Sequence, residues 1–357
     1  MTACGAPGAP GILKCLRAAP GREVFVYGVD ANPGAVGFAL VDAGEVCPPG
    51  GAPGYAEAIL QIVRRERIRV VLPLSSMELG ALAGAADRFR QAGAVVLVSD
   101  PAGLKAANNK ADVMAAAARV GVPVPESRRV ADLAEFQAAV ASLGYPDRAV
   151  CFKPEFGKGG RGFRILSASH DRFTDLFEQK PGSAYMTLAE AVEVLGSRPR
   201  FPPLLVMEHL PGAEHSVDVL CHKGRSLAIV PRVRTAIKLG ICFDGTVEKH
   251  DALAGFSERL VRELSLSYCI NLQFKADAAG VPRILEVNPR VSGTIVLSAA
   301  AGVNLPYLAV QLGLGEPLGP TEVAWGTRMI RYWDEVFYDA DQRPFALADH
   351  LGNLPAR

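Results

Sequence analysis

The sequence has little of the cysteine patterning that marks disulfide-bonded or zinc-binding proteins. Its 357 residues include seven cysteines, an odd number, and no two of them form a Cys-x-x-Cys pair. A disulfide framework usually shows an even, regularly spaced set, and a cysteine-based zinc site needs close pairs. We therefore expect free thiols, a reducing compartment such as the cytoplasm, and no catalytic role for Cys151.

An excess of one charge sign and aromatic residues are also scarce. The chain carries 38 basic and 37 acidic residues, a formal net charge of +1, and only 7% aromatic residues. A nucleic-acid-binding surface would show a basic stripe with interleaved aromatics, and an anionic membrane attracts basic patches. Neither nucleic acid nor a membrane surface is indicated, so small molecules are the expected partners.

Charge is absent from one long stretch, the 22 residues from Thr294 to Gly315. That length would suffice for a membrane span. Asn304 and Pro306 interrupt it, however, and the pattern favours a buried helix, a turn and a second helix that begins near Pro306. The N-terminus shows no charged leader followed by an apolar core, so no secretory signal is expected.

The first 105 residues alternate short apolar runs with helical patterns, which is typical of an α/β unit with a parallel sheet. The expected strands are 23–30, 69–74 and 94–100. The stretch "CGAPGAPG", which begins at Cys4, looks like the glycine-rich turn after an opening strand, yet only three residues precede it. The sheet is therefore expected to lack its first strand.

Ligands of a parallel sheet gather at the carboxyl ends of its strands. Asp30, Ser75, Ser76 and Glu78 follow expected strands and are candidates for the wall of a binding site. For each residue alone, a turn or a helix cap is the simpler explanation.

Two neighbouring segments, "INLQFKAD" and "ILEVNPR", place polar side chains on one face of a hairpin. Glu286 and Asn288 share a face because successive side chains of a strand alternate. If Ala279 and Gly280 form a two-residue turn, Gln273 lies directly opposite Glu286, although a longer turn or a bulge would shift that register. Carboxylate and amide oxygens suit a hard cation, so Gln273, Glu286 and Asn288 are predicted magnesium ligands.

The segment "GKGGRG" at 157–162 fits the G-x-G-x-x-G spacing that several nucleotide-binding folds share. A dinucleotide-binding fingerprint needs a helix after the loop, whereas "GFRIL" alternates like a strand. The HRD and DFG motifs of protein kinases are missing, as is the GxxxxGK[ST] of a P-loop. The order strand, glycine loop, strand predicts a flexible hairpin that folds over a nucleotide. Lys153 precedes this loop, whereas the phosphate-binding lysine of protein kinases follows it.

Four ordered stretches resemble the ATP-grasp superfamily, most of all its carbamoyl-phosphate-synthase-like branch. They are "NNKADVM…GVPVPES", "CFKPEFGKGGRG", "VMEHLPGAEHSVDVL" and "INLQFKADAAGVPRILEVNPRVSGT". The resemblance covers nearly the whole chain and implies an α/β N-terminal domain of pre-ATP-grasp type followed by an α+β ATP-grasp fold of two lobes. The implied bounds are 1–105 for the first domain, 106–202 for the small lobe with its glycine-rich lid and helical insertion, and 203–357 for the large lobe.

The resemblance also implies site residues. ATP would lie between the lobes, bound by Lys110, Lys153, Gly157, Lys158, Gly159, Gly160, Gly162, Glu208, His209, Leu210 and Glu214. The two lysines of this set that lie outside the lid would contact phosphates, because an ammonium group is a compact point charge. Glu208 and the backbone of His209 and Leu210 would read the adenine edge, and Glu214 would bind a ribose hydroxyl.

The metal ligands implied by the family are again Gln273, Glu286 and Asn288. Arg290 and Lys153 would stabilise the charge on the transferred phosphoryl group. Four further residues would contact an anionic substrate: Arg232, Arg234, Ser292 and Thr294.

Members of this superfamily typically make an acyl phosphate from a carboxylate and ATP, release ADP, and let an amine or thiol displace the phosphate. The resemblance therefore implies an ADP-forming carboxylate–amine or carboxylate–thiol ligase that uses ATP and Mg²⁺, with Mn²⁺ as an alternative metal and a homodimer as the candidate assembly. Two other functions stay open. One is bicarbonate activation with a partner, since a complete carbamoyl-phosphate synthase has two ATP-grasp halves and this chain has one; the other is a non-catalytic ATP-binding module.

The closing stretch, residues 325–339, alternates apolar and charged residues and is expected to pack on the ATP lobe as a strand. Tyr332 and Trp333 are expected in the core.

Overall fold

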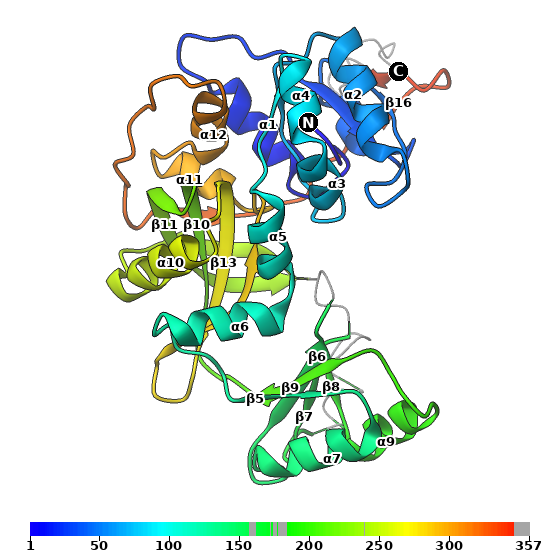
Figure 1. Ribbon diagram of the computed structural model, residues 1–357, viewed down its shortest axis with the longest axis vertical. Helices are drawn as coiled ribbons and strands as arrows, with labels where there is room; N and C mark the ends of the chain where they lie inside the picture. Colours follow the sequence, from blue (N-terminus) through cyan, green and yellow to red (C-terminus); the bar gives the residue numbers. More distant parts are fainter. Residues whose placement is uncertain (157–161, 172, 174–176, 178–183, 239, 346–357) are drawn as a thin grey trace, which may run out of the picture.

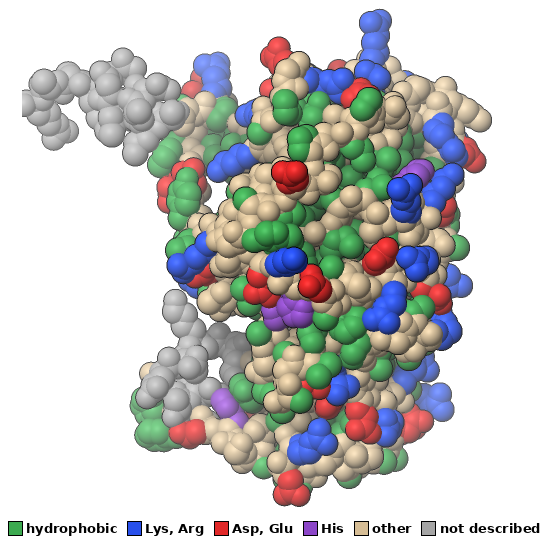
Figure 2. All heavy atoms as spheres, turned by 90° about the vertical axis from the view of Figure 1, so that its left-hand side faces the viewer, with side chains coloured by type: hydrophobic (Ala, Val, Ile, Leu, Met, Phe, Trp, Pro, Cys, Tyr) green, Lys and Arg blue, Asp and Glu red, His purple; other side chains and the backbone are tan. Residues whose placement is uncertain are grey.

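Three units follow one another along the long axis of the computed structural model (Figure 1): an N-terminal domain, a central unit built on a six-stranded sheet, and a small lobe. The structure describes residues 1–156, 162–171, 173, 177, 184–238 and 240–345. Within these ranges, no helix is both long and apolar enough to cross a membrane. Figure 2 shows basic and acidic side chains interspersed over one face.

The N-terminal domain has the expected alternation of strands and helices. Its strands are β1 (Tyr27–Asp30), β2 (Ala43–Val46), β3 (Val70–Val71) and β4 (Val95–Val96). Its helices are α1 (Ala9–Arg17), the 3-10 helix η1 (Val36–Ala39), α2 (Tyr55–Arg65), α3 (Leu79–Gly84) and α4 (Ala86–Gln91). The pairs β1–β2 and β3–β4 are both parallel, as the pattern of alternating apolar runs predicts.

Residues 1–3 form no strand of their own, but they lie in the place expected for the first strand. Thr2 forms parallel bridges to both Val29 and Pro73. Its N–H donates to the Leu72 carbonyl at 3.1 Å, and the N–H of Val29 donates to the Met1 carbonyl at 3.0 Å. The first residues therefore connect β1 to β3.

Among its described residues, the small lobe has a five-stranded sheet and two helices. Its elements are β5 (Ser127–Val130), α7 (Leu133–Ser142), β6 (Val150–Pro154), β7 (Arg164–Leu166), β8 (Tyr185–Met186), α9 (Leu188–Gly196) and β9 (Leu204–Glu208), with the sheet order β5-β9-β6-β7-β8. Phe136 of α7 meets Phe152 of β6 edge to face, with ring centroids 5.2 Å apart. The strand predicted after the glycine loop is present as β7, antiparallel to β6.

The lobe boundaries differ from those expected at 106 and 203. Strand β9 pairs with both β5 and β6, so residues up to Glu208 belong to the small-lobe sheet. Helices α5 (Pro101–Asn108) and α6 (Lys110–Arg119) pack instead on the large lobe, where Val113 of α6 joins a core with Leu272 and Phe274. The chain thus enters the large lobe first, crosses to the small lobe, and returns.

The large lobe is an antiparallel sheet with the order β14-β13-β10-β11-β12-β15. Its elements are β10 (Glu214–His222), β11 (Arg225–Lys238), β12 (Ile241–Val247), α10 (Asp251–Glu263), β13 (Tyr268–Ala276), β14 (Pro282–Asn288), α11 (Val296–Ala300), α12 (Leu305–Gly313) and β15 (Arg328–Ile330). The two helices expected in the uncharged stretch are α11 and α12, and Asn304 caps the second by accepting the Tyr307 N–H at 3.2 Å.

The C-terminal segment joins the sheet only briefly. Strand β15 pairs with β12, which confirms the expected packing on the ATP lobe. Tyr332 and Trp333 are 71% and 74% exposed, so their expected place in the core is wrong. The reason is that β15 is the edge strand and the chain leaves the sheet directly after it. The final described elements are the two short strands β16 (Phe337–Tyr338) and β17 (Pro344–Phe345).

Candidate nucleotide and metal site

The hairpin of β13 and β14 has the register that the sequence predicted, for a different reason. Gln273 lies opposite Glu286, but near the turn Phe274 pairs with Ile284, one position off that register. The turn is longer than two residues, since Asp277 accepts the N–H groups of Ala279 and Val281, each at 2.9 Å. A bulge between the two pairs then restores the predicted alignment, so the longer turn and the bulge cancel.

The three predicted metal ligands are half-buried and share one end of this hairpin. The amide nitrogen of Asn288 donates to Glu286 Oε1 at 2.9 Å, and the amide nitrogen of Gln273 donates to Asn271 Oδ1 at 3.4 Å. These bonds turn both amide nitrogens toward protein acceptors, which leaves the amide oxygens and Glu286 Oε2 as donors for a cation. An all-oxygen set of this kind fits Mg²⁺.

The small lobe contributes Lys153 to the same place. Its ammonium group donates to the carbonyl of Leu285 at 3.2 Å, and Leu285 is the residue that the bulge inserts between Glu286 and Ile284. The bulge therefore both aligns the three predicted metal ligands and presents a carbonyl that holds Lys153 in position.

Lys110 is the first residue of α6, where Asn109 caps the helix by accepting the N–H of Ala111 at 2.8 Å. Burial lowers the pKa of both Lys110 and Lys153, and the carboxylate of Glu286 opposes this in each case. Two partly dehydrated ammonium groups beside one carboxylate suit a ligand that brings several negative charges.

Arg290 completes the set of cations. Its Nε donates to Ser76 Oγ at 3.3 Å and its Nη1 to the Val291 carbonyl at 2.7 Å. Burial lowers its pKa, while Glu286 and then Asp218 oppose the shift. Glu286 is thus the carboxylate that acts on all three cations, Lys110, Lys153 and Arg290.

The N-terminal domain reaches the site through Ser76 and through Gly8, where an added Cβ would lie 2.5 Å from the Cα of Gly293. The other candidates from the strand ends have structural roles. Asp30 accepts the N–H of Gly5 at 2.8 Å, and buried Glu78 accepts the Tyr55 hydroxyl at 2.5 Å. Burial raises the pKa of Glu78, and the hydrogen bonds that its carboxylate accepts oppose this shift.

A buried polar network lies behind the metal ligands. Asp218 is fully buried and accepts from Arg232 Nε at 3.0 Å and from Asn271 Nδ2 at 2.8 Å. Arg232 also donates to Ser292 Oγ at 3.1 Å, and Thr294 is buried in the same loop. Sequence reasoning missed Asp218 and Asn271. The signal was available, since strand alternation places Asp218 on the face of Glu214.

Glu214 and Arg234 were assigned to ribose and to substrate, but the structure brings them to each other. Arg234 Nη1 forms an ion pair with the Glu214 carboxylate, and its Nη2 donates to the Gly240 carbonyl at 2.8 Å. Glu214 remains near Lys153, since its carboxylate is one of the charges that oppose the lowering of the Lys153 pKa by burial.

The expected adenine edge lies at the end of β9. The Glu208 carboxylate accepts the Glu126 N–H at 2.9 Å, which joins the segment before β5 to the end of β9. It also lies 3.6 Å from guanidinium nitrogens of Arg148 and Arg283. His209 donates its N–H to the Ala149 carbonyl at 3.3 Å, and Leu210 is buried. Burial lowers the pKa of His209, which favours its neutral form.

Most of the predicted lid lies outside the described residues: Gly157, Lys158, Gly159 and Gly160. Gly162 is described and has φ +75°, a conformation that favours glycine, and an added Cβ there would lie 2.7 Å from Pro154.

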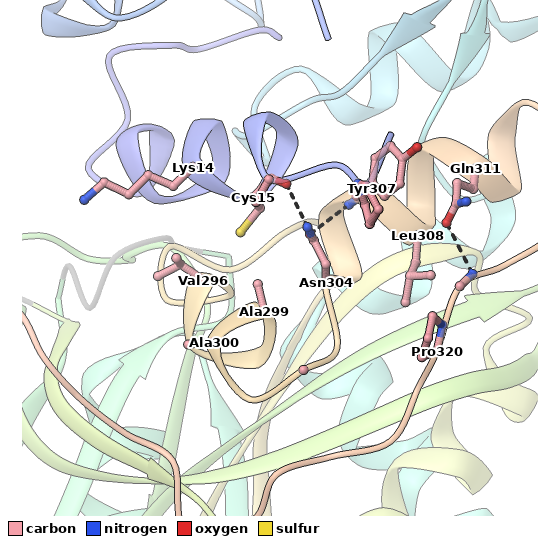
Figure 3. Close-up of a pocket in the computed structure, with 14 residues that line it drawn as sticks. Lys14, Cys15, Val296, Ala299, Ala300, Asn304, Tyr307, Leu308, Gln311 and Pro320 are labelled. Carbon is pink, nitrogen blue, oxygen red and sulfur yellow. Dashed lines mark hydrogen bonds between the residues drawn. The ribbon is translucent and has the colours of Figure 1, made fainter. Parts of the chain in front are cut away.

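A separate cavity of about 630 Å³ opens between α1, α11 and α12 (Figure 3). Its walls are mainly apolar and include Val296, Ala300 and Leu308, with Lys14 from α1. None of the candidate nucleotide or metal residues lines it, so the cavity is distinct from the site described above.

Comparisons with known proteins agree with this organisation. Residues 109–196 match the family described as carbamoyl-phosphate synthase L chain, ATP binding domain. Residues 200–332 match the family of ATP-grasp in the biosynthetic pathway with Ter operon, and residues 11–98 match the PylC-like N-terminal domain.

Solved structures share the fold at low sequence identity. An ADP complex of N5-carboxyaminoimidazole ribonucleotide synthetase superposes with a TM-score of 0.65 at 16% identity, over 90% of this chain and 77% of that one. The biotin carboxylase domain of 2-oxoglutarate carboxylase from Hydrogenobacter thermophilus, solved with MgADP, ADP and bicarbonate, gives 0.64 at 18% identity, over 89% and 70%. N5-carboxyaminoimidazole synthetase from Staphylococcus aureus gives 0.61 at 14%, over 90% and 78%. Both lobes and the N-terminal domain thus follow the ATP-grasp arrangement.

The lowered pKa values of Lys110 and Lys153 predict how nucleotide binding depends on pH. Each lysine is charged below its pKa, so ATP affinity should be highest there and fall as the pH rises through values below the ordinary 10.5.

Lys153→Met should weaken ATP binding roughly 10–100-fold, as a charge-assisted hydrogen bond contributes about 1.5–3 kcal/mol. Calorimetric titration from neutral pH upward measures both effects. The control is Lys105→Met on the exposed side of α5, and an affinity unchanged in Lys153→Met would remove Lys153 from the site.

Proposed function

We propose that this chain, which belongs to the ATP-grasp superfamily, is an ATP- and Mg²⁺-dependent ligase that joins a carboxylate to an amine or thiol and releases ADP and phosphate. The observation that carries the proposal is the position of Glu286. It lies opposite Gln273 in the hairpin, and its carboxylate opposes the lowering of the pKa of Lys110, Lys153 and Arg290 by burial. These three cations come from three separate parts of the chain.

The proposed roles follow from the charge and the ligand chemistry of each residue. Gln273, Glu286 and Asn288 would hold Mg²⁺, with Mn²⁺ as an alternative, and the bound ion would neutralise phosphate charge and orient the transferred group. Lys110 and Lys153 would bind the phosphates from two lobes, and Arg290 would face the charge that develops during transfer. The partly exposed edge after β9 would receive the adenine.

The proposed reaction needs no covalent intermediate on the protein. A carboxylate oxygen of the substrate attacks the terminal phosphorus of ATP, the bond from that phosphorus to the bridging oxygen breaks, and ADP leaves. The nucleophile then attacks the carbonyl carbon of the acyl phosphate, loses a proton, and releases phosphate. Positioning and charge stabilisation are sufficient for both steps.

Bicarbonate is a second candidate for the carboxylate. One structural neighbour was solved with bicarbonate and ADP, and this supports including bicarbonate among the substrates. Arg232 favours a small anion, because its Nη1 is buried and has no hydrogen-bond partner among the described residues. In this proposal, the attacking atom of the second substrate is nitrogen or sulfur.

Analysis of the nucleotide products tests the function. Purified protein with Mg²⁺ and ATP is offered pooled carboxylates, pooled amines and thiols, and bicarbonate with ammonia, with Glu286→Gln as the blank. ADP and phosphate that appear only with a particular carboxylate pool are the expected result. AMP and pyrophosphate would mean adenylation and would overturn the proposed mechanism. ATP binding without turnover in any pool would support a non-catalytic module.

A further inference from the structure

We propose that His215, Glu248 and His250 form a binding site for one zinc-like divalent ion on the face of the large-lobe sheet opposite to the nucleotide site. The three side chains offer one ligand atom each, and these atoms all lie within 4.8 Å of one another. The sequence contains no Cys-x-x-Cys and no closely spaced histidines that would predict this site, because one ligand lies on β10 and the other two follow β12.

The strand register separates this site from the magnesium ligands. Ser216 lies opposite Gln273, whereas His215 lies opposite Phe274, so His215 points to the other face of the sheet. On that face Phe274 packs near Phe256 of α10, with ring centroids 6.2 Å apart. His250 is the N-cap of the same helix. The site therefore joins β10 to the start of α10.

The donor chemistry favours zinc over magnesium. Two imidazoles and one carboxylate are a common zinc set, usually with water as the fourth ligand, whereas magnesium prefers oxygen ligands only. The His215 side chain is only 9% exposed, while the Glu248 side chain is 35% exposed and can admit an ion and its water. The site thus has a buried side and an open side.

The hydrogen bonds suit a site that can accept an ion. His215 Nε2 lies 2.8 Å from Glu248 Oε1, and its Nδ1 is buried. The two rings, of His215 and His250, meet edge to face at 5.5 Å. An ion between Nε2 and the carboxylate would displace the proton that lies between them, which moves to Nδ1 of the neutral ring, and would bind both groups at once.

Binding through His250 has one cost. Its Nδ1 now accepts the Leu253 N–H at 3.3 Å. An ion on Nε2 would place the remaining ring proton on Nδ1 and end that long bond. The cost is small because the bond is near the limit of hydrogen-bond length, and it suggests a variant that keeps the cap without the ligand: His250→Asn, since asparagine is a preferred N-cap.

Zinc binding to the metal-stripped protein in excess Mg²⁺ tests the site, by competition with a chromophoric chelator and by metal analysis after desalting. We expect one Zn²⁺ per chain in the unmodified protein. Glu248→Gln and His250→Asn should each weaken binding at least about 100-fold, because loss of even an outer-shell partner typically costs 10–100-fold. Zn²⁺ should also raise the melting temperature of the unmodified protein and not that of the two variants.

Two controls fix the location. His222→Asn removes an exposed histidine at the other end of β10 and should leave zinc affinity unchanged. Glu286→Gln should also bind zinc normally, whatever becomes of its turnover. Equal zinc affinity in the unmodified protein, Glu248→Gln and His250→Asn would overturn the proposal, and so would loss of zinc binding in Glu286→Gln.

Discussion

Glu286→Gln is expected to lower ATP turnover by about 10²–10³-fold, with little change in melting temperature, because removal of a single group that stabilises the transition state commonly costs that much. Here one substitution removes a predicted metal ligand and the carboxylate that opposes the lowering of the pKa of Lys110, Lys153 and Arg290 by burial. Glutamine keeps the shape and can still accept from Asn288, so the hairpin should fold.

The same substitution makes a second, independent prediction for the cations. Since Glu286 raises the pKa of Lys110 and Lys153 against the effect of burial, its removal should lower both values further. The alkaline loss of ATP affinity should then begin at a lower pH in Glu286→Gln than in the unmodified protein. This readout depends on binding alone and does not require that the substrate be known.

Turnover of ATP with the identified substrates, or of ATP alone if a basal rate exists, measures the main effect. Glu258→Gln is the matched control, because Glu258 lies on α10 with its side chain 53% exposed. Full activity in Glu286→Gln would remove Glu286 from the metal site and, with it, the central argument for the proposed ligase.

The metal hairpin shows how much of the site the sequence could predict. The alternation of polar and apolar residues was enough to place Glu286 and Asn288 on one face. The pairing of Gln273 with Glu286 was predicted from an assumed two-residue turn, and it is present because the longer turn and the bulge cancel. The five-residue turn and the bulge were beyond prediction. They depend on the side chain of Asp277 and on the carbonyl of Leu285, which Lys153 binds from the other lobe.

Long-range pairs set the limit of sequence reasoning elsewhere. Asp218 and Asn271 are 53 residues apart and become partners only through the register of β10 and β13. Glu214 and Arg234 each looked like a ligand-binding residue alone, and the structure pairs them across β10 and β11. A charged residue in a strand can thus be recognised from alternation, but its partner cannot.

The lobe boundaries were missed for a related reason. Residues 106–122 follow the N-terminal domain and precede the small lobe in the sequence, but Val113 and Val122 pack in the core of the large lobe. Sequence order shows where a helix begins, as the Asn109 cap does for α6. It does not show which distant sheet covers the helix.

The second large effect expected is a loss of stability when the Asp218 carboxylate is removed. Asp218→Leu would leave the Arg232 guanidinium, itself 2% exposed, without its carboxylate in the interior. Breaking a buried ion pair by removing one partner typically costs about 3–5 kcal/mol, whereas replacing both partners with apolar residues is often neutral. Asp218→Leu should therefore unfold at markedly lower urea concentration, and Asp218→Leu with Arg232→Met should recover most of the loss.

This pair of variants also separates stability from substrate binding. Arg232 has two partners, Asp218 and Ser292, and a buried Nη1 that makes no hydrogen bond within the described part of the chain. If that nitrogen binds the carboxylate substrate, the double variant should be stable yet have a much higher KM for the carboxylate, with ATP affinity unchanged. A double variant that is both stable and fully active would restrict Arg232 to a structural role. If the double variant is as unstable as Asp218→Leu, the stability comes from the hydrogen bond between Asn271 and Asp218 and not from the ion pair between Asp218 and Arg232.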